Sequence, residues 1–133
     1  MIKSRDILYP PRSLGKNIHA CMFTKEFFKG KNIHVKDKQD NLKLISTHLG
    51  ISLIQLAQVH GIKIKEVVER GNEIIPNTDG VYTRTSNIAL CIQTADCMPI
   101  ILSSQNGKEI SALHVGWRGL SKGILEESFK YFQ

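Results

Sequence analysis

The chain has 133 residues, of which 41% are hydrophobic and 23% are charged. This size predicts a single domain over residues 1–133, with enough apolar residues for a core. No apolar run approaches the ~20 residues that a membrane-spanning helix needs, and the N-terminus lacks the apolar core of a signal peptide. We therefore expect a cytoplasmic protein without membrane contact, whose three cysteines are reduced.

The net charge of +6 comes from the first fifty residues, which hold ten Lys/Arg against four Asp/Glu. A basic patch of this kind can bind nucleic acid or other anions. Here the lysines are scattered among Asp and Asn, without interleaved aromatic residues or a recognisable nucleic-acid motif. We expect a solvated face and no nucleic-acid partner, with affinity for phosphate-bearing small molecules as the alternative.

The first predicted elements are an irregular segment through residues 10–11, a strand over 18–23 and a helix. Asp40 or Asn41 can cap the helix at its N-terminus, and Gly50 can end it. The helix carries an apolar face formed by Leu42, Ile45 and Leu49.

Residues 54–60 alternate in character, which predicts a strand with His60 on the same face as its apolar side chains. Residues 63–69 are expected to form its partner strand. Residues 72–79 are rich in turn formers and predict a loop. Short extended segments are expected at residues 80–84 and 88–91.

A hairpin is the clearest prediction of the second half. Strands over 99–103 and 109–115 flank a turn at 105–107, which reads Gln-Asn-Gly. In such a hairpin Cys97 and His114 lie near the same end, so their side chains can meet.

The last predicted element is a helix capped by Ser121. Its apolar face would consist of Ile124, Leu125, Phe129 and Phe132. No stop signal follows this helix, which suggests that more protein follows. Together these elements predict a mixed α/β domain with several short strands and a helix near either end.

His60, Cys97 and His114 form a candidate metal set. Two imidazoles and a thiolate suit zinc, and three protein ligands leave the fourth tetrahedral position open, as in a catalytic site. The separations of 36 and 16 intervening residues match no compact zinc module. Two other interpretations stay open: an inert buried Cys97 beside hydrogen-bonded core histidines, and a Cys97–His114 nucleophilic pair.

Residues around this set also suggest chemistry. Asp96 is costly to bury beside a core thiol and fits a proton carrier or an orienter of ligands. Arg118, in a glycine-flanked run, suits phosphate or carboxylate. Trp117 could stack on a planar base, although core packing is the alternative. Asp79 could face the site or belong only to a turn.

Four segments closely resemble the YfiH-like family, also called the laccase-domain or multicopper polyphenol oxidase family and assigned to purine nucleoside phosphorylases. They are QVHG at 58–61, TDGVYT at 78–83, TADCMPIIL at 94–102 and ALHVGWRGL at 112–120. The segments occur in the family's order, and the resemblance extends more weakly over most of the chain.

The resemblance implies zinc ligands at His60, Cys97 and His114, with Cys97 and His114 also serving catalysis. It implies phosphorolysis of adenosine and inosine to free base and ribose 1-phosphate, cleavage of methylthioadenosine, and deamination of adenosine. The implied fold is an α/β (α+β) layered mixed-sheet sandwich, likened to bacterial toxin deamidases.

The same resemblance predicts the remaining site residues. Arg118 would face phosphate and Asp96 would lie next to the metal, both as catalytic residues. We expect Gln58, Asp79 and Trp117 to bind the purine nucleoside together with Arg118.

The chain also departs from the family pattern. A lysine-rich segment over 25–38 replaces the usual glycine- and serine-rich one, and Leu42 stands where the family usually has arginine. The family continues beyond the point where this sequence ends, so the sequence resembles a C-terminally truncated member. A separate C-terminal half or a homo-oligomer is therefore a candidate partner.

Two alternatives to the phosphorylase remain. One is a metal-free Cys-His hydrolase or deamidase that acts on cell-wall precursors. The other is a non-catalytic truncated remnant.

The laccase label predicts copper, which is the alternative metal. The chain has five histidines, and only two lie in the motifs, too few for a multicopper cluster. A blue-copper site would need an axial Met, but Met98 directly follows Cys97 and adjacent strand residues point to opposite faces. Copper oxidase activity is expected to be secondary at most.

Overall fold

The computed structural model describes residues 6–9, 14–15, 17–31 and 37–132, so the irregular segment expected at residues 10–11 lies outside the described part. The helices and strands are β1 (Ile7–Leu8), β2 (Met22–Phe23), α1 (Lys25–Phe28), α2 (Lys38–Leu49), β3 (Ser52–Ala57), β4 (Ile64–Val67), β5 (Glu73–Pro76), β6 (Gly80–Thr83), β7 (Ile88–Cys91), β8 (Met98–Ser103), β9 (Ile110–Val115), α3 (Trp117–Ser121) and α4 (Ile124–Phe129).

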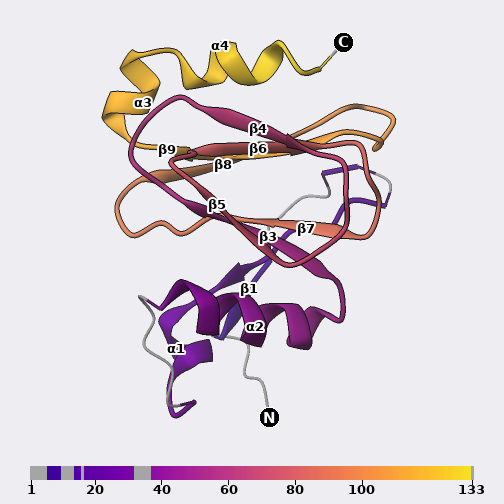
Figure 1. Cartoon of the computed structure of the whole chain (residues 1–133), viewed down its shortest axis with the longest axis vertical. Coiled ribbons are helices and arrows are strands. Elements are labelled where there is room, and N and C mark those ends of the chain that lie inside the picture. The colour runs from indigo at the N-terminus through magenta and orange to yellow at the C-terminus, as the bar shows by residue number, and fades with distance from the viewer. Residues whose placement is uncertain (1–5, 10–13, 16, 32–36, 133) are drawn as a thin grey trace.

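The molecule is a layered sandwich (Figure 1). Two β-sheets lie face to face in the middle. The α2 helix, with α1 and the β1–β2 pair, covers the outer face of one sheet, and α3 and α4 cover the outer face of the other. This arrangement confirms the predicted α/β layered mixed-sheet sandwich.

The two central sheets differ in topology. The first has the order β5-β3-β7 and is parallel throughout. The second has the order β4-β6-β9-β8, with one parallel pair and two antiparallel pairs. The antiparallel β8–β9 pair is the predicted hairpin, and its register places Met98 opposite Val115 and Pro99 opposite His114.

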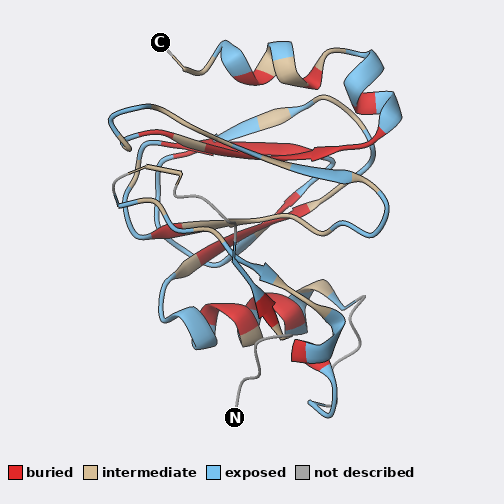
Figure 2. Cartoon of the chain, turned by 180° about the vertical axis from the view of Figure 1, so that it is seen from behind, coloured by how far each residue is buried: buried red, intermediate tan, exposed pale blue. Residues whose placement is uncertain are grey.

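The core of the described residues consists of three apolar clusters, one between each pair of neighbouring layers. Figure 2 shows the buried residues on the central strands and on the inner faces of α2 and α4. The cluster between the sheets contains Ile54, Leu56 and Val81. Because β3 is central in a parallel sheet, it is buried on both faces.

The strand predicted over 54–60 is wrong at its C-terminal end, because β3 stops at Ala57. The backbone N–H groups of residues 59–61 bond to the carboxylate of Asp79 rather than to a neighbouring strand. His60 consequently leaves the strand with a φ of 63°. It does not share a strand face with Leu56.

The predicted partner of β3 is also wrong. β4 pairs with β6 in the second sheet, so the segment 58–63 carries the chain from one sheet to the other. The true neighbours of β3 are β7 and β5. β5 lies inside the stretch 72–79 that we expected to be a loop.

The N-terminal region contains less strand and more helix than expected. Within the strand predicted over 18–23, only Met22–Phe23 pairs, with β1. The α1 helix lies within the lysine-rich segment, of which residues 32–36 are outside the described part. The α2 helix begins earlier than predicted, because Asp37, rather than Asp40 or Asn41, accepts the cap bonds from the backbone N–H groups of Gln39 and Asp40.

The predicted C-terminal helix is two helices. Gly123, with a φ of 90°, separates α3 from α4, and the Ser121 hydroxyl donates to the Arg118 carbonyl instead of capping. Ile124 is buried as expected, whereas Phe129 is 58% exposed and does not belong to the buried face.

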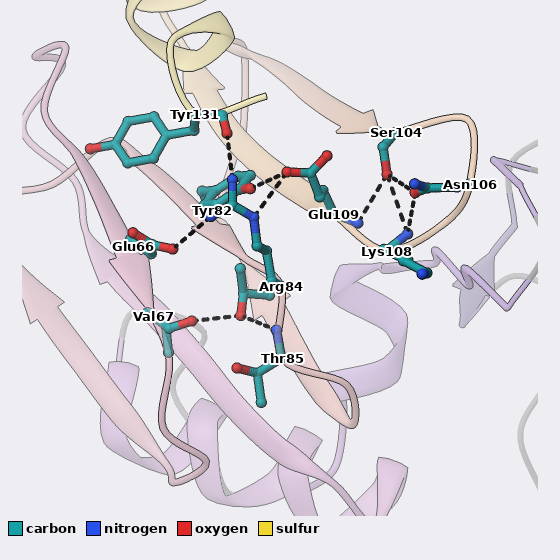
Figure 3. A network of polar contacts seen from close by, with 11 residues as sticks. Glu66, Val67, Tyr82, Arg84, Thr85, Ser104, Asn106, Lys108, Glu109 and Tyr131 are labelled. Atoms are coloured by element: carbon teal, nitrogen blue, oxygen red, sulfur yellow. Dashed lines mark hydrogen bonds and ion pairs between the residues drawn. The ribbon is translucent and has the colours of Figure 1, made fainter. Parts of the chain in front are cut away.

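A polar network ties the end of the described chain to the second sheet (Figure 3). The Tyr82 hydroxyl donates to the Glu109 carboxylate, which also pairs with Arg84. Arg84 in turn donates to the Tyr131 carbonyl oxygen. In the β6–β9 register Thr83 lies opposite Ile110, so this network is at the end of the strand pair opposite to His114.

None of the helices in the described ranges is both long and apolar enough to cross a membrane.

Candidate metal centre

His60, Cys97 and His114 come together at one end of the sandwich. Their candidate ligand atoms all lie within 4.8 Å of one another. His60 follows β3, Cys97 immediately precedes β8, and His114 lies near the end of β9. The hairpin thus brings together Cys97 and His114, and the crossover between the sheets adds His60.

The donor set fits zinc. Bond lengths of roughly 2.0–2.3 Å place two ligands of a tetrahedral zinc roughly 3.3–3.8 Å apart. The observed spacing of at most 4.8 Å lies within about 1.5 Å of that separation. The three side chains differ in exposure: His60 is exposed, Cys97 is half-buried and His114 is buried. The alternative of an inert Cys97 beside two core histidines is wrong for His60, because His60 lies at the surface.

A hydrogen bond orients His114. Its Nδ1 atom lies 2.9 Å from Oδ1 of Asp79. An ionised carboxylate can only accept a hydrogen bond, so Nδ1 carries the proton and Nε2 keeps a lone pair that can bind a metal. A carboxylate behind a ligating histidine commonly sets the tautomer in this way.

Asp79 is the anchor of the site. Its carboxylate also accepts hydrogen bonds from the backbone N–H groups of Val59, His60 and Gly61, at 3.2, 2.8 and 2.8 Å. Burial alone would raise the pKa of Asp79, but the bonds from His114 and from these three amides outweigh it, so its pKa is below the ordinary value. The side chain is fully buried.

Gln58 holds the segment that leads to Cys97. Its Nε2 donates to the carbonyl of Gln93, and its Oε1 accepts from the Gln93 backbone N–H, both at 2.7 Å. Two hydrogen bonds between the Gln58 side chain and the Gln93 backbone thus join the end of β3 to the segment that follows β7. The sequence predicted contact between Gln58 and substrate, and that role stays a prediction.

Glycines allow the α3 segment to lie against the site. A Cβ at Gly116 would be 3.1 Å from Cδ2 of His60 and 3.2 Å from Sγ of Cys97. A Cβ at Gly119 would be 2.9 Å from the carbonyl oxygen of Gly61. At both positions the protein itself fills the space that a side chain would need.

The other predicted residues lie at the surface around the centre. Asp96 is exposed and directly precedes Cys97. Trp117 is 73% exposed, so the core-packing alternative for this residue is wrong. Cζ of Arg118 lies 4.9 Å from the centroid of the Trp117 ring, a cation–π distance. Both side chains belong to the first turn of α3, next to Gly116.

Sequence reasoning missed three of the residues that shape the centre: Gly61, Gln93 and Gly116. The first and last are the glycines of QVHG and HVGWRG, and the motifs signalled them without showing what they contact. Gln93 acts through its backbone, which leaves no trace in the sequence.

Comparisons with known proteins agree with the motifs. Residues 24–133 match the family described as multi-copper polyphenol oxidoreductase laccase. A purine nucleoside phosphorylase from Haemophilus influenzae is 34% identical over 138 residues, covering 93% of this chain and 56% of that protein. The purine nucleoside phosphorylase YfiH of Escherichia coli is 34% identical over 101 residues, covering 74% of this chain and 40% of that protein.

Solved structures share the fold. YlmD from Geobacillus stearothermophilus is similar with a TM-score of 0.61 and 28% identity, covering 73% of this chain and 42% of that one. A Neisseria meningitidis protein gives the same TM-score at 24% identity, over 79% of this chain and 43% of that one, which supports the fold alone. The chain thus spans about half the length of the relatives that it matches.

The family match over residues 24–133, the relatives and the shared fold lead to one conclusion: the chain belongs to the YfiH-type laccase-domain family, the multi-copper polyphenol oxidoreductase laccases.

Proposed function

We propose that this chain carries the zinc centre of a purine nucleoside phosphorylase. The observation that supports this most is the convergence of His60, Cys97 and His114 within 4.8 Å, in a chain whose relatives are named purine nucleoside phosphorylases. Bound zinc supplies a Lewis acid and lowers the pKa of a bound water. Zinc is favoured over copper because a thiolate with two imidazoles suits it without an axial methionine.

The reaction is phosphorolysis of adenosine, inosine or methylthioadenosine. A phosphate oxygen attacks C1′ of the ribose, the C1′–N9 bond breaks, and its electron pair leaves with the base, which takes up a proton. The products are the free base and ribose 1-phosphate, or its methylthio form.

Named side chains have distinct roles in this proposal. Arg118 binds phosphate through its planar fork, and the exposed ring of Trp117 stacks on the purine. Asp96 passes a proton to N7 of the departing base. Gln58 and Asp79 serve substrate binding through the segments that they hold, because their polar atoms are engaged within the protein.

Product analysis tests the proposal. Zinc-loaded protein is incubated with adenosine or inosine, with and without phosphate, and the bases and ribose 1-phosphate are quantified by chromatography. We expect adenine or hypoxanthine only when phosphate is present, and loss of product in Arg118→Ala. Phosphate-independent conversion of adenosine to inosine would instead reveal the deaminase activity that we propose as secondary.

One observation favours a second candidate. Cys97, His114 and Asp79 provide a thiol, an imidazole and a carboxylate that orients the imidazole, the order of parts in a Cys-His nucleophilic site. The corresponding function is a metal-free hydrolase or deamidase of cell-wall precursors. It requires Cys97 to be alkylated by iodoacetamide at neutral pH even with excess zinc, whereas protection of Cys97 by zinc would exclude it.

A further inference from the structure

The turn of the β8–β9 hairpin contains a reactive pair of residues that the metal centre does not use. Asn106 precedes Gly107, whereas every other asparagine of the chain precedes a residue with a side chain. The backbone nitrogen of the following residue can attack the amide carbon of an asparagine side chain, and a glycine leaves that approach open. Asn106 is also exposed, so water reaches it.

Two hydrogen bonds activate the Asn106 amide (Figure 3). The Ser104 hydroxyl and the Lys108 backbone N–H donate to its Oδ1 at 2.8 and 3.0 Å. A backbone N–H can only donate, so the atom that it contacts is the oxygen of the amide. Attack at Cγ places negative charge on Oδ1, and donors already directed at that atom stabilise the charge as it develops.

The attacking nitrogen is restrained by a turn bond at the surface. The Gly107 N–H donates to the Ser104 carbonyl oxygen at 3.0 Å. Such a bond contributes only about 1 kcal/mol, and exposed turns open locally at small cost. Neither bond to Oδ1 of Asn106 involves this N–H, so opening of the turn bond leaves the amide activated.

Asp79 and Gly80 form a similar pair that lacks these properties. Asp79 is fully buried, and its carboxylate accepts bonds from His114 and from three backbone N–H groups. A carboxylate is also a weaker electrophile than an amide. The chemistry is therefore specific to the hairpin turn.

We propose that Asn106 is a self-modification site, which converts to aspartate and isoaspartate in the folded protein. The Gly107 nitrogen loses its proton and bonds to Cγ of Asn106. The Cγ–Nδ2 bond breaks, and Nδ2 takes up the proton and leaves as ammonia. Water then opens the succinimide ring at either of its carbonyls. The sum consumes water and releases ammonia, and needs neither an oxidant nor a reductant.

The two products act differently on the hairpin. Aspartate keeps the acceptor and offers Ser104 and Lys108 a charged partner, which strengthens both bonds. Isoaspartate routes the backbone through Cβ and so lengthens the turn. Glu109 lies directly beyond the turn and pairs with Tyr82 and Arg84, so the longer turn weakens the polar network at this end of the strand pair.

Ageing of the folded chain tests the proposal without metal or nucleoside. The protein is incubated at mildly alkaline pH, each asparagine is followed by peptide mass spectrometry, and isoaspartate is quantified with an isoaspartyl methyltransferase. We expect Asn106 to react before Asn77 and Asn87, which are equally exposed but precede Thr78 and Ile88. A urea-unfolded sample should react more slowly at Asn106, because it lacks the directed donors.

Variants of the turn isolate the role of the donors. Ser104→Ala should slow the reaction by up to about tenfold, less than in a buried oxyanion site because water surrounds the turn. Ser104→Thr keeps a hydroxyl and should restore the rate. Asn106→Gln is the matched control, since its longer side chain would close a larger ring and should give no isoaspartate.

The thermal midpoint is a second readout. Asn106→Asp should raise it, and the isoaspartate fraction of aged protein should have a lower one. An intact Asn106 after Asn77 or Asn87 has reacted would overturn the proposal. A faster reaction in the unfolded sample, or an unchanged rate in Ser104→Ala, would show that the turn does not activate the amide.

Discussion

At the scale of single residues, the two histidines of the centre depend on one carboxylate. Asp79 bonds Nδ1 of His114 and the backbone N–H of His60. It therefore sets the tautomer of one ligand and the position of the other. Its low pKa keeps it an acceptor at neutral pH, which preserves both contacts.

The substitution Asp79→Asn should lower zinc affinity about 10–100-fold, the usual cost of losing such a partner. The carboxylate of Asp79 accepts from His114 and from three backbone N–H groups. Asparagine has only one acceptor oxygen, so at least one of these four bonds must be lost or weakened. Competition with a chromophoric chelator measures the change. Asp40→Asn is the control, because Asp40 is exposed on α2 and should leave zinc affinity unchanged; an equal loss in both variants would refute the anchoring role.

Gly116→Ala should weaken zinc binding without unfolding the protein. The added methyl group would lie 3.1–3.2 Å from His60 and Cys97, closer than ordinary carbon contacts, and would displace two of the three ligands. Gly71→Ala is the matched control, since a Cβ there has no neighbour within 4 Å. Chelator competition combined with circular dichroism separates loss of metal from loss of fold, and unaltered affinity in Gly116→Ala would contradict the contact.

At the scale of elements, the local sequence pattern was sufficient to predict the β8–β9 hairpin but not the end of β3 or the strand β5. The β8–β9 hairpin could be predicted because its turn and its alternating strands lie within one short stretch. The end of β3 could not, because Asp79, nineteen residues from His60, captures the amides that a longer strand would use. β5 was missed because only Ile74 and Ile75 are apolar among turn formers, and its pairing with β3 decides its conformation.

For the candidate metal centre, the sequence predicted which residues are the ligands but not how they come together. His60, Cys97 and His114 were identified from residue chemistry and from the motifs. Their mutual distance depends on the crossover from the first sheet to the second, and on Gly116, whose missing side chain leaves room for two ligands. Neither feature can be calculated from spacing along the chain.

The network at the far end of β6 and β9 predicts how stability changes with pH. The hydrogen bond from Tyr82 and the pairing with Arg84 hold the pKa of Glu109 below its ordinary value. The ionised Glu109 therefore stabilises the folded state at neutral pH, and this stabilisation is lost as pH falls through the lowered pKa. Burial and Glu109 raise the pKa of Tyr82 to about 12. The stabilisation by protonated Tyr82 is complete up to about pH 10, the pKa of tyrosine in the unfolded chain. It is lost between about pH 10 and 12.

Tyr82→Phe should therefore lower the thermal midpoint at neutral pH by roughly 3–5 °C and flatten the decline of stability between pH 10 and 12. Thermal unfolding across pH measures both effects. Because the network lies at the opposite end of the strand pair from His114, zinc affinity should stay the same. A variant that loses zinc but keeps its midpoint would contradict this separation.

At the scale of the whole molecule, the candidate ligands come from both central sheets. His60 lies in the crossover that leaves the first sheet, whereas Cys97 and His114 belong to the hairpin of the second. All three, with their supports Asp79 and Gln58, belong to the described residues. Zinc binding should therefore need only this chain.

Elemental analysis of the purified 133-residue chain should accordingly find about one zinc per molecule, lost in Cys97→Ala and retained in Cys21→Ala, whose thiol lies outside the centre. Free zinc at 100 times its dissociation constant should stabilise the folded chain by about 2.7 kcal/mol, measurable as a rise in the thermal midpoint that Cys97→Ala abolishes. A folded chain without metal affinity would refute the metal centre and favour the metal-free pair of Cys97 and His114.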